Sequence, residues 1–156
     1  MIFPKFSANG YYCDITRMAI DGEPSDEERS IEEAVVESHA AAVAVAKPGV
    51  AYGEVDKAAR DVLERYDFAK FFTHGIGHGV GLETHEPPYV ETNDTLEEGM
   101  VFTIEPSVYR PGKPAVRVED TFVVTADGCE QLTRLPIQFF RGQSGPGEPH
   151  CPVPRL

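Results

Sequence analysis

Three shortages in this 156-residue chain each exclude a class of protein. The chain has only three cysteines, Cys13, Cys129 and Cys151, and their odd number and wide spacing exclude a disulfide framework and a cysteine-type zinc motif. No apolar run approaches the length needed to cross a bilayer, and the first residues lack the layout of a signal peptide. We therefore expect a cytoplasmic protein with free thiols and no membrane partner.

Basic residues are scarce relative to acidic ones. The chain has 14 lysines and arginines against 26 aspartates and glutamates, which gives a formal net charge of −12 at pH 7. Such a surface repels a nucleic-acid backbone, so nucleic acid is excluded as a partner and a cation fits better. The plain alternative is a solvated acidic surface without a specific partner. The length and the 41% hydrophobic content suit one domain with its own core.

The first part of the chain predicts a strand followed by two helices. Residues 10–20 mix aromatic and β-branched side chains and end at a turn signal, which is typical of a strand. Ser25 and Glu28 have the spacing of a capping box that begins a helix, and Pro48 ends that helix. A second helix is expected to run to about Tyr66. The apolar faces of the two helices are Ile31, Val35, Ala42 and Val45, and Val55, Ala58, Ala59, Val62 and Leu63.

The second half of the chain predicts β structure. Strand-like runs occupy residues 100–105, 115–125 and 130–134, and a hairpin turn signal lies at 126–128. From residue 141 the apolar content is too low for packing, so a disordered tail is expected there. Helices followed by strands make the predicted fold class α+β.

Glycines and histidines dominate the segment from His74 to His85. A dinucleotide-binding fingerprint would need glycine at position 80, which is Val80. A helical two-histidine zinc motif would need glutamate directly after His74, and the intervening glycines disfavour a helix. The remaining interpretation is an extended segment whose glycines allow close backbone approach, while His74, His78 and His85 point into a common cleft.

Carboxylates on either side of this segment complete a candidate metal centre. Asp14 precedes it, and Glu105 and Glu119 follow it. One neutral nitrogen donor with several hard oxygen donors suits a hydrolytic divalent metal centre. Taken singly, Asp14 is also explained as a surface carboxylate and Glu105 as the end of a strand. His39, on the first helix, and His150, in the tail, are expected to be solvated.

Four motifs follow one another along the chain: Asp14-Ile-Thr-Arg17, residues 74–86, residues 99–106 and residues 117–121. In order and spacing they resemble the motifs of the pita-bread metallopeptidases, which include aminopeptidase P, prolidase and methionine aminopeptidase. The sequences Thr84-His85-Glu86 and Arg117-Val-Glu-Asp120 are closer to the branch that cleaves Xaa-Pro bonds. The resemblance covers about residues 1–136 and implies a partial pita-bread (creatinase/aminopeptidase) fold, with helices packed on a curved antiparallel sheet. Residues 137–156 would form the C-terminal tail.

The resemblance also implies a metal site and its ligands. The family binds two manganese, cobalt or zinc ions through two aspartates, one histidine and two glutamates. Asp14 and Glu119 match the two bridging carboxylates, and His78 and Glu105 match the other ligands of one ion. Two such ions activate a bridging water for attack on a peptide carbonyl.

Catalytic roles are implied for three residues. His85 matches the histidine that contacts the substrate and stabilises the oxyanion, and His74 matches a second histidine of the substrate pocket. Glu105 is placed to act as the general base. Arg17 and Arg117 are expected to orient or neutralise neighbouring carboxylates.

One departure from the family pattern concerns the start of the chain. Another aspartate of the family lies on a strand that forms a hairpin with the strand of Asp14, yet no acidic residue precedes Asp14 here. We expect that the chain is truncated and has lost this strand, with one tight metal site instead of two. An unpaired edge on the Asp14 strand would follow, and a homodimer could cover it.

Two functions are therefore open. The first is a metal-dependent exopeptidase that hydrolyses the bond between an N-terminal residue and proline, so that its substrate is a peptide with proline at the second position. The second is a catalytically inactive relic, or a module that binds peptide or protein on the same fold.

Overall fold

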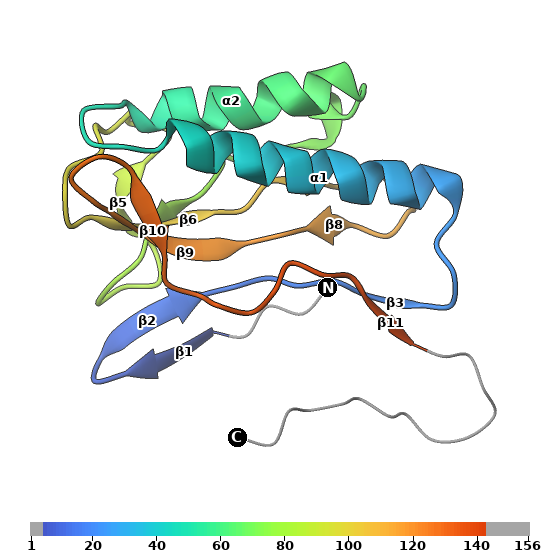
Figure 1. The fold of residues 1–156 in the computed structure, drawn as a ribbon, viewed down its shortest axis with the longest axis horizontal. Helices are drawn as coiled ribbons and strands as arrows, with labels where there is room; N and C mark the ends of the chain where they lie inside the picture. The colour runs from blue at the N-terminus through green and yellow to red at the C-terminus, as the bar shows by residue number, and fades with distance from the viewer. Residues whose placement is uncertain (1–4, 143–156) are drawn as a thin grey trace.

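The computed structural model describes residues 5–142, with only the backbone described at residues 5–8. Two helices, α1 (Asp26–Val45) and α2 (Tyr52–Arg65), lie side by side on one face of an antiparallel sheet, as Figure 1 shows. The predicted α+β class and the packing of helices on a sheet are therefore confirmed. Within the described part of the chain, no helix has the length and hydrophobicity needed to span a membrane.

Both helices form where the sequence predicts them. The side chain of Ser25 accepts a hydrogen bond from the backbone N–H of Glu28, and the Glu28 carboxylate accepts one from the backbone N–H of Ser25. This capping box satisfies amide groups that otherwise have no partner in the first turn. The apolar faces of α1 and α2 then pack on each other and on the sheet. The fully buried members include Ile31, Val35, Ala42, Val55, Ala59 and Leu63.

The main sheet has five strands in the order β10-β9-β6-β4-β5. Their bounds are Cys129–Gln131, Asp120–Val124, Val101–Ile104, His78–Gly79 and Glu86–Tyr89. Phe102 of β6 is paired with Phe122 of β9, and both belong to the core beneath the helices. Because side chains alternate along a strand, Thr103 and Thr121 face away from the helices. Glu105 follows β6 directly and Glu119 precedes β9, so both acids lie at the edge of this second face.

The hairpin at the start of the chain corrects the expectation that the partner strand of Asp14 is lost. β1 (Lys5–Ala8) pairs in antiparallel fashion with β2 (Tyr11–Asp14), with Lys5 opposite Asp14. Asn9 and Gly10 join the strands with φ values of 55° and 85°. Positive φ at both residues of an Asn-Gly turn suits a tight hairpin. The strand is present, therefore, although β1 carries no carboxylate.

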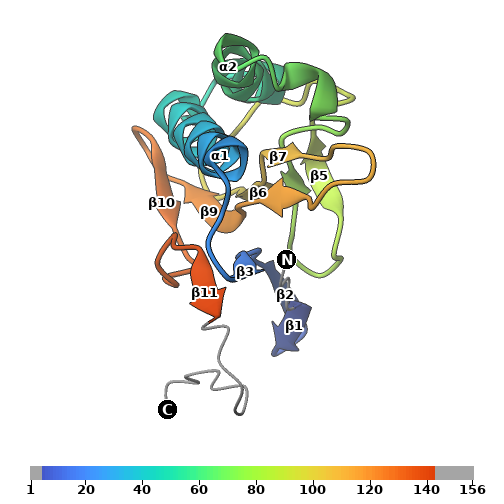
Figure 2. The ribbon, with the colours of Figure 1, turned by 90° about the vertical axis from the view of Figure 1, so that its right-hand side faces the viewer.

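The strand predicted for residues 10–20 is interrupted. β2 ends at Asp14, an isolated bridge joins Thr16 to Glu119, and β3 (Ala19–Asp21) then pairs in parallel with β11 (Phe140–Gly142). Figure 2 shows β3 and β11 together below the main sheet, next to the β1–β2 hairpin. The predicted strand 115–125 is also divided, into β8 (Val116–Arg117), which pairs with β7 (Ser107–Val108), and β9.

The ordered part of the C-terminal segment extends to a later residue than the sequence predicts. Ile137 and Phe139 are half-buried against the hydrophobic core, and β11 extends the paired backbone to Gly142. Arg141 and Gly142, which were expected to be disordered, thus belong to a strand. The rest of the predicted tail, with His150, lies outside the described residues.

His39 is buried, contrary to the expectation that it is solvated. It is 4% exposed in the middle of α1, and its ring centroid lies 5.7 Å from that of Phe122. Its Nε2 atom is 3.5 Å from Oδ2 of the buried Asp120. The helical period places position 39 beside Val35 and Ala42, on the face that packs on the sheet. Burial lowers the pKa of His39 from 6.5 to about 4, and the Asp120 carboxylate opposes this shift.

The lowered pKa of His39 predicts a loss of stability in mild acid. Below pH 6.5 the unfolded chain binds a proton at His39 that the folded chain does not bind until about pH 4. The contribution of His39 to the free energy of unfolding is therefore fully present above pH 6.5, and it is lost as the pH decreases toward 4. Between pH 7.5 and 5.5 we expect His39 to account for a loss of unfolding free energy on the order of 1 kcal/mol. Urea unfolding at both pH values measures it, and His39→Gln should remove that part of the pH dependence. An unchanged pH dependence in this variant would contradict the prediction.

Candidate metal centre

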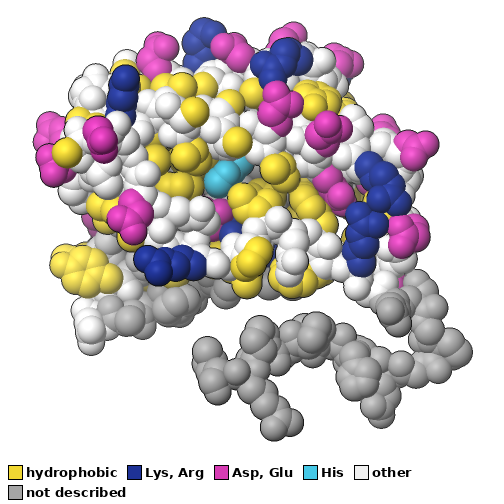
Figure 3. Space-filling model, in the orientation of Figure 1, with side chains coloured by type: hydrophobic (Ala, Val, Ile, Leu, Met, Phe, Trp, Pro, Cys, Tyr) yellow, Lys and Arg dark blue, Asp and Glu magenta, His cyan; other side chains and the backbone are white. Residues whose placement is uncertain are grey.

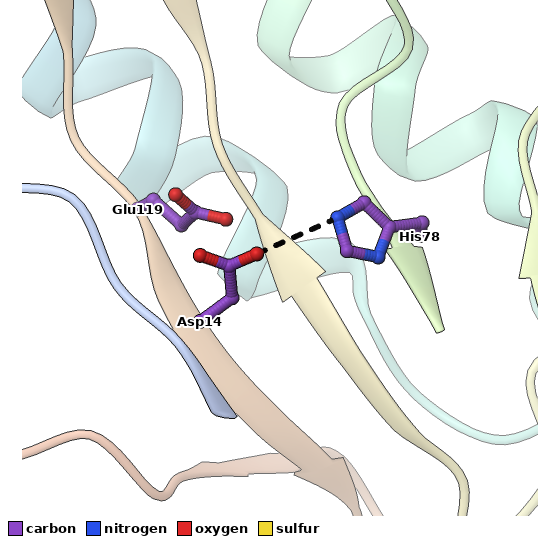
Figure 4. Close-up of side chains that lie close together, drawn as sticks. All are labelled: Asp14, His78 and Glu119. Atoms are coloured by element: carbon purple, nitrogen blue, oxygen red, sulfur yellow. Dashed lines mark ion pairs between the residues drawn. The ribbon is translucent and has the colours of Figure 1, made fainter. Parts of the chain in front are cut away.

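Three buried side chains from distant parts of the sequence converge below the sheet. Asp14 ends β2, His78 begins β4 and Glu119 directly precedes β9, and one ligand atom of each lies within 4.8 Å of the other two. Figure 4 shows the two carboxylates beside each other and the imidazole facing them. The backbone of Asp14 is fixed on the sheet because its N–H donates to Thr121 Oγ1 and its carbonyl accepts from the same hydroxyl.

The imidazole of His78 is oriented for coordination through Nε2. Its Nδ1 atom lies 2.9 Å from the carbonyl oxygen of Gly79, and a carbonyl only accepts, so Nδ1 carries the hydrogen. The Nε2 atom is 4.0 Å from Asp14 Oδ2 and 3.3 Å from Glu105 Oε1. A backbone carbonyl that fixes the tautomer in this way is typical of metal-binding histidines.

Glu105 lies next to the three-residue group, with Arg117 on its other side. Arg117 Nη1 is 3.3 Å from Glu105 Oε2, and Arg117 Nη2 is 3.7 Å from Glu119 Oε2. Two acids, Glu105 and Glu119, thus lie against one guanidinium group, and Asp14 lies close to Glu119. Burial, followed by repulsion from Glu119, raises the pKa of Glu105 to about 8, and Arg117 opposes this shift. This concentration of hard oxygen donors around one imidazole fits a divalent cation.

Threonine hydroxyl groups hold two of the carboxylates. Thr16 Oγ1 donates to Glu119 Oε2 at 2.5 Å, and Thr103 Oγ1 donates to Glu105 Oε1 at 3.2 Å. Thr103 Oγ1 also accepts a hydrogen bond from the backbone N–H of His78 at 3.1 Å. The sequence analysis missed both threonines. Each is two residues from a predicted ligand, and the alternation of side chains along a strand could have identified them.

The two other predicted histidines lie at different depths. His85 is exposed, and its ring centroid lies 4.0 Å from that of His78. His74 is half-buried, with Nε2 2.6 Å from Ser107 Oγ and its ring 5.6 Å from that of Tyr109. The Tyr109 hydroxyl accepts from Arg117 Nη1 at 3.3 Å. His85 thus contacts the centre directly, whereas His74 is connected to it through Tyr109 and Arg117.

The glycines of the segment permit the close backbone approach that their pattern predicts. A Cβ atom on Gly79 would overlap the backbone oxygens of Glu86 and Pro87 on the neighbouring strand β5. A Cβ atom on Gly77 would overlap the carbonyl oxygen of Thr103 and lie 2.5 Å from the Tyr52 hydroxyl. The two glycines flank His78, so the backbone on either side of this residue lies close to β6 at Gly77 and to β5 at Gly79.

A groove of about 800 Å³ lies near the centre: its lining includes Cys13 and Ile15, the neighbours of Asp14 in the sequence, but none of the four predicted metal ligands. Its walls are mainly apolar, with Tyr11, Tyr12, Cys13 and Ile15 on the β2 side and Val80, Met100, Val101, Leu132 and Leu135 opposite. Tyr11 is 61% exposed and Leu132 is 47% exposed. Figure 3 shows that acidic and basic side chains on one face of the molecule lie mostly around its rim, with hydrophobic side chains gathered between them.

Known proteins are similar to this chain in sequence. The Xaa-Pro dipeptidase of Pyrococcus furiosus is 44% identical over 128 residues, which cover 81% of this chain and 37% of that protein. The Xaa-Pro dipeptidase of Lactobacillus helveticus is 45% identical over 127 residues, which cover 80% of this chain and 34% of that protein. The chain therefore spans little more than a third of these relatives.

Solved structures of Xaa-Pro peptidases are similar to this chain in fold. An X-Pro aminopeptidase from Thermotoga maritima superposes with a TM-score of 0.85 at 38% identity, over 89% of this chain and 40% of that one. The prolidase from Pyrococcus furiosus superposes with a TM-score of 0.83 at 41% identity, over 86% of this chain and 40% of that one. The predicted partial pita-bread fold is thus confirmed. The profile of metallopeptidase family M24 matches residues 5–126. The chain belongs to metallopeptidase family M24.

Proposed function

We propose that the chain is the metal-binding part of an exopeptidase that hydrolyses the bond between an N-terminal residue and proline. The observation that carries the proposal is the convergence of Asp14, His78 and Glu119 within 4.8 Å of one another in a buried position. The relatives named above as Xaa-Pro dipeptidases support the substrate class.

Four residues would hold the metal. We assign Asp14, His78, Glu105 and Glu119 to one tight site for manganese, cobalt or zinc. A second ion would lack a carboxylate from β1, whose sequence is Lys-Phe-Ser-Ala, so it should bind weakly. When bound, a divalent ion supplies charge stabilisation for the peptide carbonyl and lowers the pKa of water.

The chain's own residues would supply the proton transfer and the positioning. Glu105, buried and 3.3 Å from both His78 Nε2 and Arg117 Nη1, would act as a carboxylate that accepts a proton from the attacking water and delivers it to the leaving proline nitrogen. His85 is exposed beside His78, where it could donate a hydrogen bond to the carbonyl oxygen as negative charge develops. His74, next to Tyr109, would line the substrate pocket.

The second candidate function is a catalytically inactive module that binds peptide or protein. One observation favours it: β1, the strand paired with that of Asp14, carries no carboxylate. Such a module would retain the metal site and the apolar groove without turnover.

An assay of hydrolysis separates the two functions. The substrates are Met-Pro and Met-Pro-Gly, with Met-Ala as the control, each with added Mn²⁺, Co²⁺ or Zn²⁺. The exopeptidase predicts metal-dependent release of methionine from the proline peptides only, and at least about a hundredfold slower release by the variant Glu105→Gln. Bound metal without turnover above that of buffer would refute the exopeptidase and support the inactive module.

A further inference from the structure

Arg17 is buried behind the metal centre, on the segment between β2 and β3. It is 3% exposed. A guanidinium group has five N–H donors in a planar fork, and the side chain of Arg17 makes five hydrogen bonds. The acceptors are the backbone carbonyls of Thr16, Glu119, Leu135 and Pro136 and the Oδ1 atom of Asp120.

One nitrogen of Arg17 spans the backbone bridge that holds Glu119. The N–H groups of Thr16 and Glu119 each donate to the other residue's carbonyl at 3.2 Å. Arg17 Nη1 donates to the same two carbonyls, at 2.9 Å and 2.8 Å. The hydroxyl of Thr16 meanwhile binds the side chain of Glu119. Both the backbone and the carboxylate of Glu119 are thus held against the strand that carries Asp14.

The second nitrogen fixes the residue after Glu119. Arg17 Nη2 lies 2.7 Å from Oδ1 of Asp120, which is fully buried and also accepts from Thr133 Oγ1 at 2.6 Å. His39 approaches the other carboxylate oxygen from α1. Because this ion pair is excluded from water and has several hydrogen bonds, its geometry is closely defined.

The remaining donors reach the C-terminal segment. Arg17 Nε donates to the Pro136 carbonyl at 3.0 Å, and Nη2 also donates to the Leu135 carbonyl. Beyond these residues β11 runs parallel to β3, as Figure 2 shows. One side chain therefore joins the strand of Asp14, the segment of Glu119 and the C-terminal segment.

We propose that Arg17 is a positioning residue of the metal centre, because its guanidinium group fixes Glu119 relative to Asp14 and ties both to residues 135–136. The proposal rests on the metal site of the proposed function. A purely structural arginine would affect the stability of the fold, whereas a positioning residue also determines the affinity of the folded protein for the ion.

The test is titration of the folded chain with Mn²⁺ by calorimetry, at a temperature where circular dichroism shows each variant to be folded. A lysine has one nitrogen in place of three, so it cannot bond the bridge, Asp120 and the carbonyls of Leu135 and Pro136 at the same time. We expect Arg17→Lys to bind Mn²⁺ about 10- to 100-fold more weakly, the range found for residues that orient metal ligands. The matched control is Arg110→Lys, because Arg110 has a side chain only 9% exposed and pairs with Glu27 on α1. The affinity of this control for Mn²⁺ should be unchanged.

A second variant covers the case in which Arg17→Lys does not fold. Asp120→Asn keeps the shape of its side chain but removes the charge that holds Nη2, and we expect it to weaken Mn²⁺ binding several-fold. Binding by Arg17→Lys, or by Asp120→Asn where only that variant folds, within twofold of the unsubstituted chain would overturn the proposal. An equal loss in Arg110→Lys would overturn it too. Absence of Mn²⁺ binding in the unsubstituted chain would instead refute the metal site itself.

Discussion

Replacing His78 by alanine is expected to lower the affinity of the chain for Mn²⁺ or Co²⁺ by about a hundredfold or more. His78 contributes the one nitrogen atom of the buried group with Asp14 and Glu119, and its tautomer is fixed through the carbonyl of Gly79. Removing it leaves carboxylates alone around the ion and opens a space that water can enter. Calorimetric titration of the metal-free protein measures the loss.

His85→Ala is the control for this substitution. Its ring is 4.0 Å from that of His78 but is exposed, and we assign it to the substrate and not to the ion. Metal affinity should therefore stay within about threefold of the unsubstituted value, a difference below about 1 kcal/mol. If His78→Ala binds the ion as tightly as His85→Ala does, the ligand assignment of His78 is wrong.

The second large effect is expected at Gly77. An added methyl group would overlap the carbonyl oxygen of Thr103 and lie 2.6 Å from the hydroxyl of the same residue. Neither atom moves easily, because Thr103 is buried in β6 and its hydroxyl contacts both Glu105 and His78. We expect Gly77→Ala to lower the free energy of unfolding by about 3 kcal/mol or more, which is at the upper end for overpacking. Urea unfolding at pH 7.5 measures the change.

Gly128→Ala provides the matched comparison. A Cβ atom at this position in the turn between β9 and β10 would meet only Thr125 Oγ1, at 4.0 Å. Its unfolding free energy should stay within about 0.5 kcal/mol of the original. Equal unfolding free energies for Gly77→Ala and Gly128→Ala would contradict the close contact between Gly77 and β6 that the structure shows.

Local sequence signals account for the parts of the fold that could be predicted. The pair Ser25 and Glu28 forms the capping box that its spacing predicts, and the apolar period of both helices identifies their buried faces. His39 shows the limit of such reasoning. Its burial depends on Asp120 and Phe122, which are more than 80 positions away in the sequence and reach α1 only through the sheet.

The candidate site was predictable where residue type and motif order carry the information. Asp14, His78 and Glu119 lie within 4.8 Å of one another, and Glu105 lies next to them, 3.3 Å from His78, while their binding of an ion stays a prediction. The partner strand of Asp14 was wrongly expected to be lost, because the absence of its aspartate was taken to mean the absence of the whole strand. Backbone pairing of β1 with β2 needs no carboxylate, only a turn with positive φ and residues able to extend.

The separation of Asp14, His78 and Glu119 along the sequence has a consequence for the lifetime of the protein. Since β2, β4 and β9 meet only in the native state, the denatured polypeptide holds no comparable chelating pocket. An ion present at about a hundred times its dissociation constant would then add about 2.7 kcal/mol to native stability through mass action. Metal supply would consequently set the fraction of molecules open to proteolysis, so that chelation shortens the survival of the polypeptide.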